Sequence, residues 1–94
     1  DQVAYFQSEG RYVKLVSTDN HRYIVDGTMD RIHAELDPRR FFRINRQFVI
    51  SFPAIRSMVS YSKSRVKLVL NPPTEDDTIV SVERSAEFKE WLDR

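Results

Sequence analysis

Basic and amide side chains in three short segments are the groups in this sequence best suited to chemistry. That chemistry is the recognition of anions and base edges. The segments are residues 11–14, 43–47 and 83–85, each beside an expected strand end. Arginine binds phosphate or guanine edges in a bidentate manner, and asparagine and glutamine pair with adenine edges. With a basic turn at residues 62–65, they provide the candidate contact residues Tyr12, Lys14, Arg43, Asn45, Arg46, Gln47, Lys63, Arg65 and Arg84.

The distribution of charge supports an anion-binding surface better than the net charge does. The 94 residues sum to +1, but residues 31–70 hold nine Lys or Arg against two Asp or Glu, a net +7. The flanking segments carry −2 and −4. This pattern indicates one positive face, although a strand-rich domain also carries surface charge for solubility alone.

Catalytic and metal-binding constellations are difficult to assemble from these residues. There is no cysteine, and neither His21 nor His33 has metal-ligand spacing to the other or to nearby carboxylates. The two glycines, Gly10 and Gly27, cannot build a phosphate cradle, and no serine lies in a G-x-S-x-G motif. We therefore expect no enzyme, no metal and no cofactor.

Length and composition predict one domain spanning residues 1–94, of globular rather than disordered type. No apolar run approaches the ~18 residues of a membrane span, and no signal peptide is recognised. The absence of cysteine favours a reducing cytoplasm. Because the chain begins at Asp1 without Met, we expect it to be excised from a longer protein.

Hydrophobic periodicity predicts a mainly β domain with antiparallel strands, one short internal helix and one C-terminal helix. In the helix expected at 28–36, Met29, Ile32 and Leu36 share one face and Thr28 is a plausible N-cap. Ser85 is expected to cap the last helix. The strands are expected at 3–7, 11–17, 21–26, 55–61, 66–70 and 78–82, with a mixed β-prone stretch at 41–52 that Pro53 interrupts.

Tyr12 has two open interpretations. Alternation in residues 11–17 turns Val13 and Leu15 toward the core and Tyr12 and Lys14 toward the opposite face. Tyr12 is then either an exposed strand residue or a contact residue.

Three segments, in this order, resemble the motifs of LytTR-type DNA-binding domains. Residues 42–51 (FRINRQFVIS) are similar to the central motif of that family. Residues 9–15 (EGRYVKL) resemble its early strand, and residues 79–84 (IVSVER) its late element. The resemblance covers essentially all 94 residues. It implies an elongated stack of small antiparallel sheets with a short helix.

The same resemblance implies the output domain of a bacterial two-component response regulator, following an N-terminal receiver domain. Such domains reach two successive major grooves through strand-end loops and commonly bind imperfect direct repeats as pairs. By position, Tyr12, Arg46 and Arg84 are then the expected base-contact residues.

Several residues depart from the family pattern. Asn45 replaces the common histidine, Gln47 the common serine, and Ser51 a frequent asparagine. Glu83 stands where many members have arginine, so whether Arg84 takes over that contact is open. A glutamate there would repel phosphate but could accept from a cytosine amino group.

The leading hypothesis is sequence-specific double-stranded DNA binding, with DNA promoters as the partner and a possible homodimer on DNA. The alternative is a protein-interaction module without nucleic-acid binding. Retention on heparin or random duplex at low salt would distinguish the two.

Overall fold

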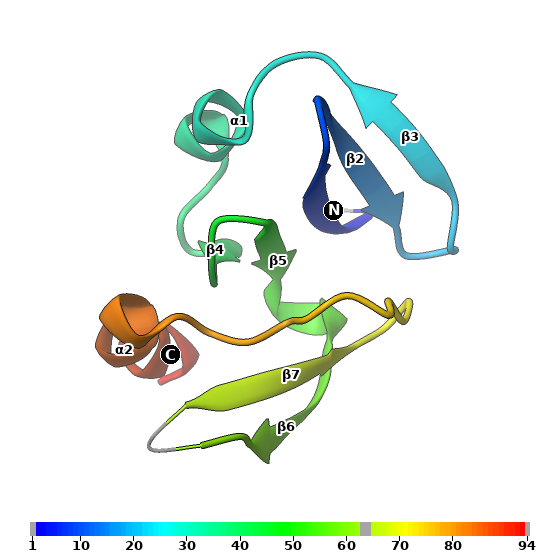
Figure 1. The fold of residues 1–94 in the computed structure, drawn as a ribbon. Coiled ribbons are helices and arrows are strands. Elements are labelled where there is room, and N and C mark those ends of the chain that lie inside the picture. Colours follow the sequence, from blue (N-terminus) through cyan, green and yellow to red (C-terminus); the bar gives the residue numbers. More distant parts are fainter. Residues whose placement is uncertain (1, 63–64, 94) are drawn as a thin grey trace.

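The computed structural model describes residues 2–62 and 65–93, which form two antiparallel sheets and two α helices (Figure 1). The larger sheet has five strands in the order β3-β2-β1-β5-β4. Its strands are β1 (Val3–Glu9), β2 (Tyr12–Ser17), β3 (Arg22–Val25), β4 (Phe41–Arg43) and β5 (Phe48–Ser51). The mainly β, antiparallel fold class predicted from the sequence is confirmed.

A second sheet pairs β6 (Ile55–Ser60) with β7 (Val66–Leu70). As expected from Pro53, strand pairing stops at a 3-10 turn, η1 (Phe52–Ala54), which redirects the chain from β5 into β6. In Figure 1 the second sheet lies below β5, and the segment after residue 71 runs back between β7 and β5.

The strand predicted at residues 78–82 is wrong. Only an isolated bridge forms there, between Lys67 and Ile79. The Val80 N–H donates to the Val66 carbonyl at 2.9 Å, but the next N–H, that of Ser81, donates to the Ile44 carbonyl at 2.9 Å. Consecutive N–H groups of an extended segment point to opposite sides, so these two bonds are compatible with a strand, but a 3-10 turn begins at Val82 and the pairing with β7 ends after one bridge.

Helix α1 (Met29–Glu35) covers one face of the five-stranded sheet. The predicted stripe of Met29, Ile32 and Leu36 packs against Phe6, Val13, Phe41 and Val49 of the sheet. The predicted cap is also confirmed, because Thr28 Oγ1 accepts from the Arg31 N–H at 3.2 Å. The helix is therefore fixed to the sheet at its apolar face and at its first turn.

Helix α2 (Ser85–Leu92) and the second sheet cover the opposite face of the five-stranded sheet. This larger core comprises Ala4, Tyr5, Val16, Ile44, Phe48, Ile50, Ala54, Leu68, Leu70, Val80 and Phe88. Burial on both faces explains why Val16 is buried although alternation turns it away from Val13. Leu15 packs on the α1 side, as predicted.

Ser85 is not the N-cap of α2, contrary to the sequence expectation. Arg84 occupies the cap position, and the Ser85 hydroxyl donates to the Ser81 carbonyl at 3.1 Å. A 3-10 turn, η2 (Val82–Arg84), leads directly into the helix, so Ser85 is already its first residue. The domain measures 35 × 26 × 24 Å along its principal axes, a moderate elongation.

Candidate nucleic-acid interface

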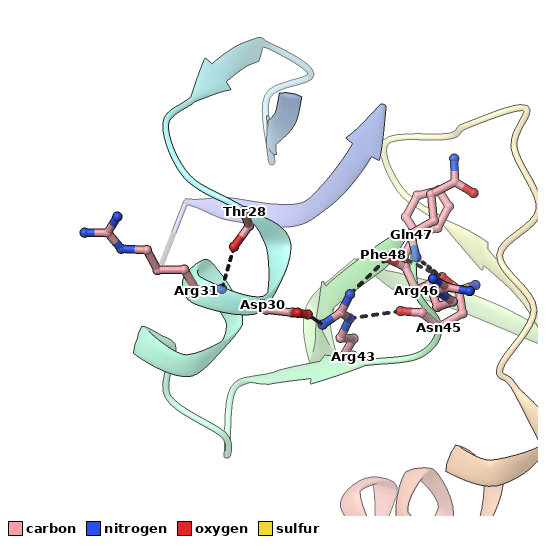
Figure 2. A network of polar contacts seen from close by, with 8 residues as sticks. All are labelled: Thr28, Asp30, Arg31, Arg43, Asn45, Arg46, Gln47 and Phe48. Carbon is pink, nitrogen blue, oxygen red and sulfur yellow. Dashed lines mark hydrogen bonds and ion pairs between the residues drawn. The ribbon is translucent and has the colours of Figure 1, made fainter. Parts of the chain in front are cut away.

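The loop of residues 44–47 between β4 and β5 is held by the side chain of Asn45. Asn45 Oδ1 accepts from the N–H of Gln47 at 2.8 Å and from that of Phe48 at 2.9 Å (Figure 2). Its Nδ2 donates to the Ile79 carbonyl at 2.9 Å. One amide side chain thus closes the loop and ties it to the segment that leads to Arg84.

Arg43 supports the same loop from the other side. Its guanidinium forms an ion pair with Asp30 and donates to the carbonyls of Asn45 at 3.2 Å and Arg46 at 3.1 Å (Figure 2). The Arg43 side chain is 12% exposed, whereas that of Asp30 is 86% exposed. The hydrogen bond and the positive charge of Arg43 lower the pKa of the Asp30 carboxyl group.

These contacts give Arg43 protein partners, although the sequence placed it among residues that dock on DNA. The position could have been read from strand alternation, because Phe41 and Arg43 share one face of β4. Phe41 is buried against α1, so Arg43 also points toward α1. The pairing of Arg43 with Asp30, thirteen residues earlier in the chain, was not predicted from the sequence.

Arg46, in contrast, presents its side chain to solvent from the loop. The residue is exposed, and its guanidinium makes no hydrogen bond or ion pair with any other residue of 2–62 and 65–93. Arg46 and Gln47 border a polar hollow of about 450 Å³. The remaining residues around it are Ser8, Thr28, Met29, Asp30 and Arg43.

The β1–β2 turn lies next to this loop. The Ser8 N–H donates to the Gln47 carbonyl at 2.8 Å, which places the end of β1 beside the loop. Gly10 adopts a φ of 62° in the turn, and Tyr12 follows it as the first residue of β2. Tyr12 is 41% exposed, so the structure agrees with the predicted outward orientation.

Lys14 shares that outward face but is already paired. Its ammonium lies 2.8 Å from Glu9 Oε1, and its side chain is only 20% exposed. It also borders a hollow shared with Arg22 and with Asp76 of the loop after β7. The structure therefore gives Lys14 acidic neighbours at the position that the sequence assigned to a DNA contact.

Arg84 is the last residue of η2. Because the Ser81 N–H donates to the Ile44 carbonyl, η2 begins directly beside the 44–47 loop. Arg84 and His33 both border a hollow of about 300 Å³ between α1 and α2. Burial lowers the pKa of His33, and the charges of Arg43 and Arg84 lower it further.

Arg65 is exposed immediately before β7. The carbonyl of the next residue, Val66, accepts from Val80, which connects this end of the second sheet to the segment before η2. Lys63, the other basic residue expected at this turn, lies outside the described residues.

Four neighbouring segments therefore carry the exposed or half-exposed candidate contact residues. The backbone hydrogen bonds and the Asn45 contacts described above link each segment to the next. We call this set of residues the contact rim: Tyr12, Arg46, Gln47, Arg65 and Arg84. Asn45 and Arg43 lie behind the rim as supports. Lys14 lies to one side of it in an ion pair.

Within residues 2–62 and 65–93, no group of three or more His, Cys, Asp or Glu side chains is placed to hold a metal ion. No helix in the same part of the chain is long and apolar enough to cross a membrane.

Known proteins are similar to this chain in sequence or in fold. The chain is 29% identical over 90 residues to the heme-containing CO-sensing transcriptional regulator RcoM 2 of Paraburkholderia xenovorans (strain LB400). That alignment covers 96% of this chain and 33% of the relative, so the chain spans about a third of the length of RcoM 2.

A solved structure has the same fold at low identity. It is the LytTr DNA-binding domain of a protein from Bacillus cereus described as a methyl-accepting/DNA response regulator. The TM-score is 0.82 at 15% identity, covering 97% of this chain and 81% of the other. The model of the LytTr DNA-binding domain matches residues 1–93, and the chain belongs to this family of DNA-binding domains.

Proposed function

We propose that this domain binds double-stranded DNA sequence-specifically, as the output domain of a bacterial transcriptional regulator, and that the contact rim reads the bases. The observation that carries the proposal is the state of Arg46. Its guanidinium is exposed and lacks a protein partner among the described residues, while its loop is fixed by Asn45 and Arg43. A donor group on a fixed backbone is what base recognition requires.

Each rim residue has a role that fits its chemistry. Arg46 donates to the O6 and N7 atoms of a guanine in the major groove, and Gln47 beside it pairs with an adenine edge. Arg84 and Tyr12, on the flanking segments, contact bases or the adjoining backbone. Because arginine is planar and bidentate, Arg46 contributes most to discrimination between sequences.

Arg65 and Lys63 bind phosphate at the turn between β6 and β7. Phosphate contacts fix the register of a protein on DNA without reading sequence. The longest dimension of the domain, 35 Å, is close to one helical turn of B-DNA, about 34–36 Å. This length supports contacts with two successive major grooves.

Glu83 is exposed within η2, one residue before Arg84. Its carboxylate repels phosphate, so we propose that Arg84 rather than residue 83 approaches the DNA. If Glu83 approached the DNA instead, its base partner would be a cytosine amino group, the base-edge donor that a carboxylate accepts from.

The proposal is tested by selecting duplexes that bind the domain from a random pool and then titrating the enriched sequence by fluorescence anisotropy. We expect a defined consensus and an affinity that falls steeply with salt. If Arg46, Lys63, Arg65 and Arg84 all contact phosphate or displace counterions, the slope of log K against log salt approaches about −3.6. Selection without a consensus, or affinity independent of salt, contradicts the proposal.

We further propose that two domains bind an imperfect direct repeat as a pair. Sedimentation of the domain with duplexes that carry one or two half-sites tests this arrangement. A 2:1 complex only on the duplex with two half-sites is the expected result. A 1:1 complex on both duplexes contradicts pairing.

The last part of the proposal concerns the whole protein, in which a receiver domain precedes this domain. RcoM 2 is described as a heme-containing CO-sensing regulator and the Bacillus cereus protein as a response regulator, so the receiver domain requires its own test. Treating the full-length protein with a small phosphodonor is expected to raise its affinity for the selected duplex. Absence of any phosphorylation contradicts the two-component assignment while leaving DNA binding intact.

A further inference from the structure

We propose that the ion pair between Asp30 and Arg43 sets the conformation of the 44–47 loop and thereby the sequence specificity of Arg46. This inference rests on the proposed DNA-binding function. It makes Arg43 a positioning residue rather than a phosphate contact, and it gives α1 a role in recognition.

The first argument is the number of acceptors that one guanidinium serves. Arg43 donates to the Asp30 carboxylate and to the main-chain carbonyls of Asn45 and Arg46. Figure 2 shows the guanidinium between the start of α1 and the loop. At 12% exposure, Arg43 has little surface left for a phosphate, and its planar fork fixes the direction of two successive loop carbonyls.

The second argument is that Asp30 has a fixed position. It lies in the first turn of α1, between the buried Met29 and Arg31, whose N–H is bound by the Thr28 cap. Met29 is 5% exposed and packs against the five-stranded sheet. The sheet therefore fixes α1, α1 fixes Asp30, and Asp30 holds Arg43 against the loop.

The third argument concerns charge. An exposed carboxylate beside a basic surface weakens DNA binding through simple repulsion of phosphate. If Asp30 acted only through its charge, removing that charge would strengthen binding to any sequence. If Asp30 acts by positioning, removing its charge weakens binding to the selected sequence. The two accounts predict changes of opposite sign for the same substitution.

The test compares Asp30→Asn with Glu35→Gln, which removes a carboxylate from an exposed residue at the other end of α1. Each variant is titrated against the selected duplex and a scrambled duplex of equal length. We expect Asp30→Asn to reduce the ratio of specific to non-specific affinity by about tenfold, equivalent to 1.4 kcal/mol. Glu35→Gln should leave the ratio unchanged.

Arg43→Lys and Arg43→Gln provide the second arm of the test. A lysine ammonium keeps the charge but cannot hold three acceptors in one plane, so Arg43→Lys should lower the same ratio. On the scrambled duplex, Arg43→Gln should leave the salt slope unchanged, because Arg43 makes no phosphate contact. A slope reduced by about one shows that Arg43 does contact phosphate and overturns the inference.

Thermal unfolding of each variant separates loss of specificity from loss of fold, and the exposed Asp30 carboxylate makes Asp30→Asn the safer variant in this respect. Folded Asp30→Asn that binds the selected duplex as tightly as the wild-type domain, or more tightly, overturns the inference. Failure of the wild-type domain to bind any duplex refutes the proposed function instead, so the two failures are distinguishable.

Discussion

The Asn45 side-chain amide donates to the Ile79 carbonyl at 2.9 Å, joining the loop that carries Arg46 to the segment that leads to Arg84. Arg46 and Arg84 come from distant parts of the chain, and this bond reinforces the link that the Ser81 N–H makes with the Ile44 carbonyl. Asn45 also accepts from the N–H of Gln47 and Phe48, so one side chain both closes the loop and anchors it. The residue that departs from the family's common histidine is therefore central to the local structure.

Asn45→Ala and Asn45→Asp separate these two roles. Asn45→Asp keeps the side-chain oxygen that accepts from the N–H groups of Gln47 and Phe48. It replaces the amide nitrogen that donates to the Ile79 carbonyl with a second oxygen. We expect hydrogen exchange at the Gln47 and Phe48 amides to accelerate in Asn45→Ala and to stay slow in Asn45→Asp. Both variants should lose about 1–3 kcal/mol of unfolding free energy, because each leaves polar groups unsatisfied. Unchanged exchange in Asn45→Ala contradicts the loop-closing role.

Tyr5 anchors the loop after β7 to the face of the five-stranded sheet. Its ring is fully buried, and its hydroxyl donates to the Pro72 carbonyl at 2.9 Å. Tyr5→Phe should lower the unfolding free energy by about 0.5–1.5 kcal/mol in urea titrations. Tyr23→Phe is the matched control, because Tyr23 is 54% exposed and should tolerate loss of its hydroxyl. Equal stability of Tyr5→Phe and wild type would show that the hydrogen bond contributes nothing.

The stability of the domain should depend on pH through His33. Burial, with the nearby charges of Arg43 and Arg84, lowers the pKa of His33 in the folded state, against a small opposing effect of Asp30. The unfolded chain then binds more protons than the folded one, so stability falls as pH drops below about 6.5 toward the lowered pKa. Urea unfolding at about pH 7.5 and at about pH 5.5 measures this loss.

His33→Gln is the control for the pH effect. It should remove much of the difference in unfolding free energy between the two pH values. Asp19 and Asp30, whose pKa values are lowered in the folded state, contribute only at more acidic pH. A pH dependence that is identical in His33→Gln and wild type contradicts the assignment.

The sequence predicted the larger elements because their patterns follow simple periods. Alternation in β2 identified the orientation of Tyr12 and Val13, and the i, i+3, i+7 spacing identified the apolar face of α1. The division of residues 41–52 into two strands was not visible, since Ile44 in the connecting loop is fully buried and continues the strand-like alternation that starts at Phe42. Residues 78–82 have strand-like composition, but the chain enters a 3-10 turn at Val82, which leaves only the bridge between Lys67 and Ile79.

The surroundings of the candidate contact residues could not be predicted for a related reason. Residue type identified the basic segments, yet type alone does not separate Arg46, which points to solvent, from Arg43, which is held by Asp30. That distinction depends on a contact between residues thirteen positions apart. The pairing of Lys14 with Glu9 likewise depends on the register of β1 with β2, which the sequence does not specify.

The most direct test of the central claim is the affinity of Arg46→Ala for the selected duplex. Arg31→Ala is the matched control, because it removes the same charge from an exposed arginine of α1 that points away from the 44–47 loop in Figure 2. Anisotropy titrations should show that Arg46→Ala loses about 1–3 kcal/mol of binding free energy and discriminates less well against the scrambled duplex. Arg31→Ala should bind nearly as the wild type does. Equal affinities for Arg46→Ala and Arg31→Ala would contradict base reading by the contact rim.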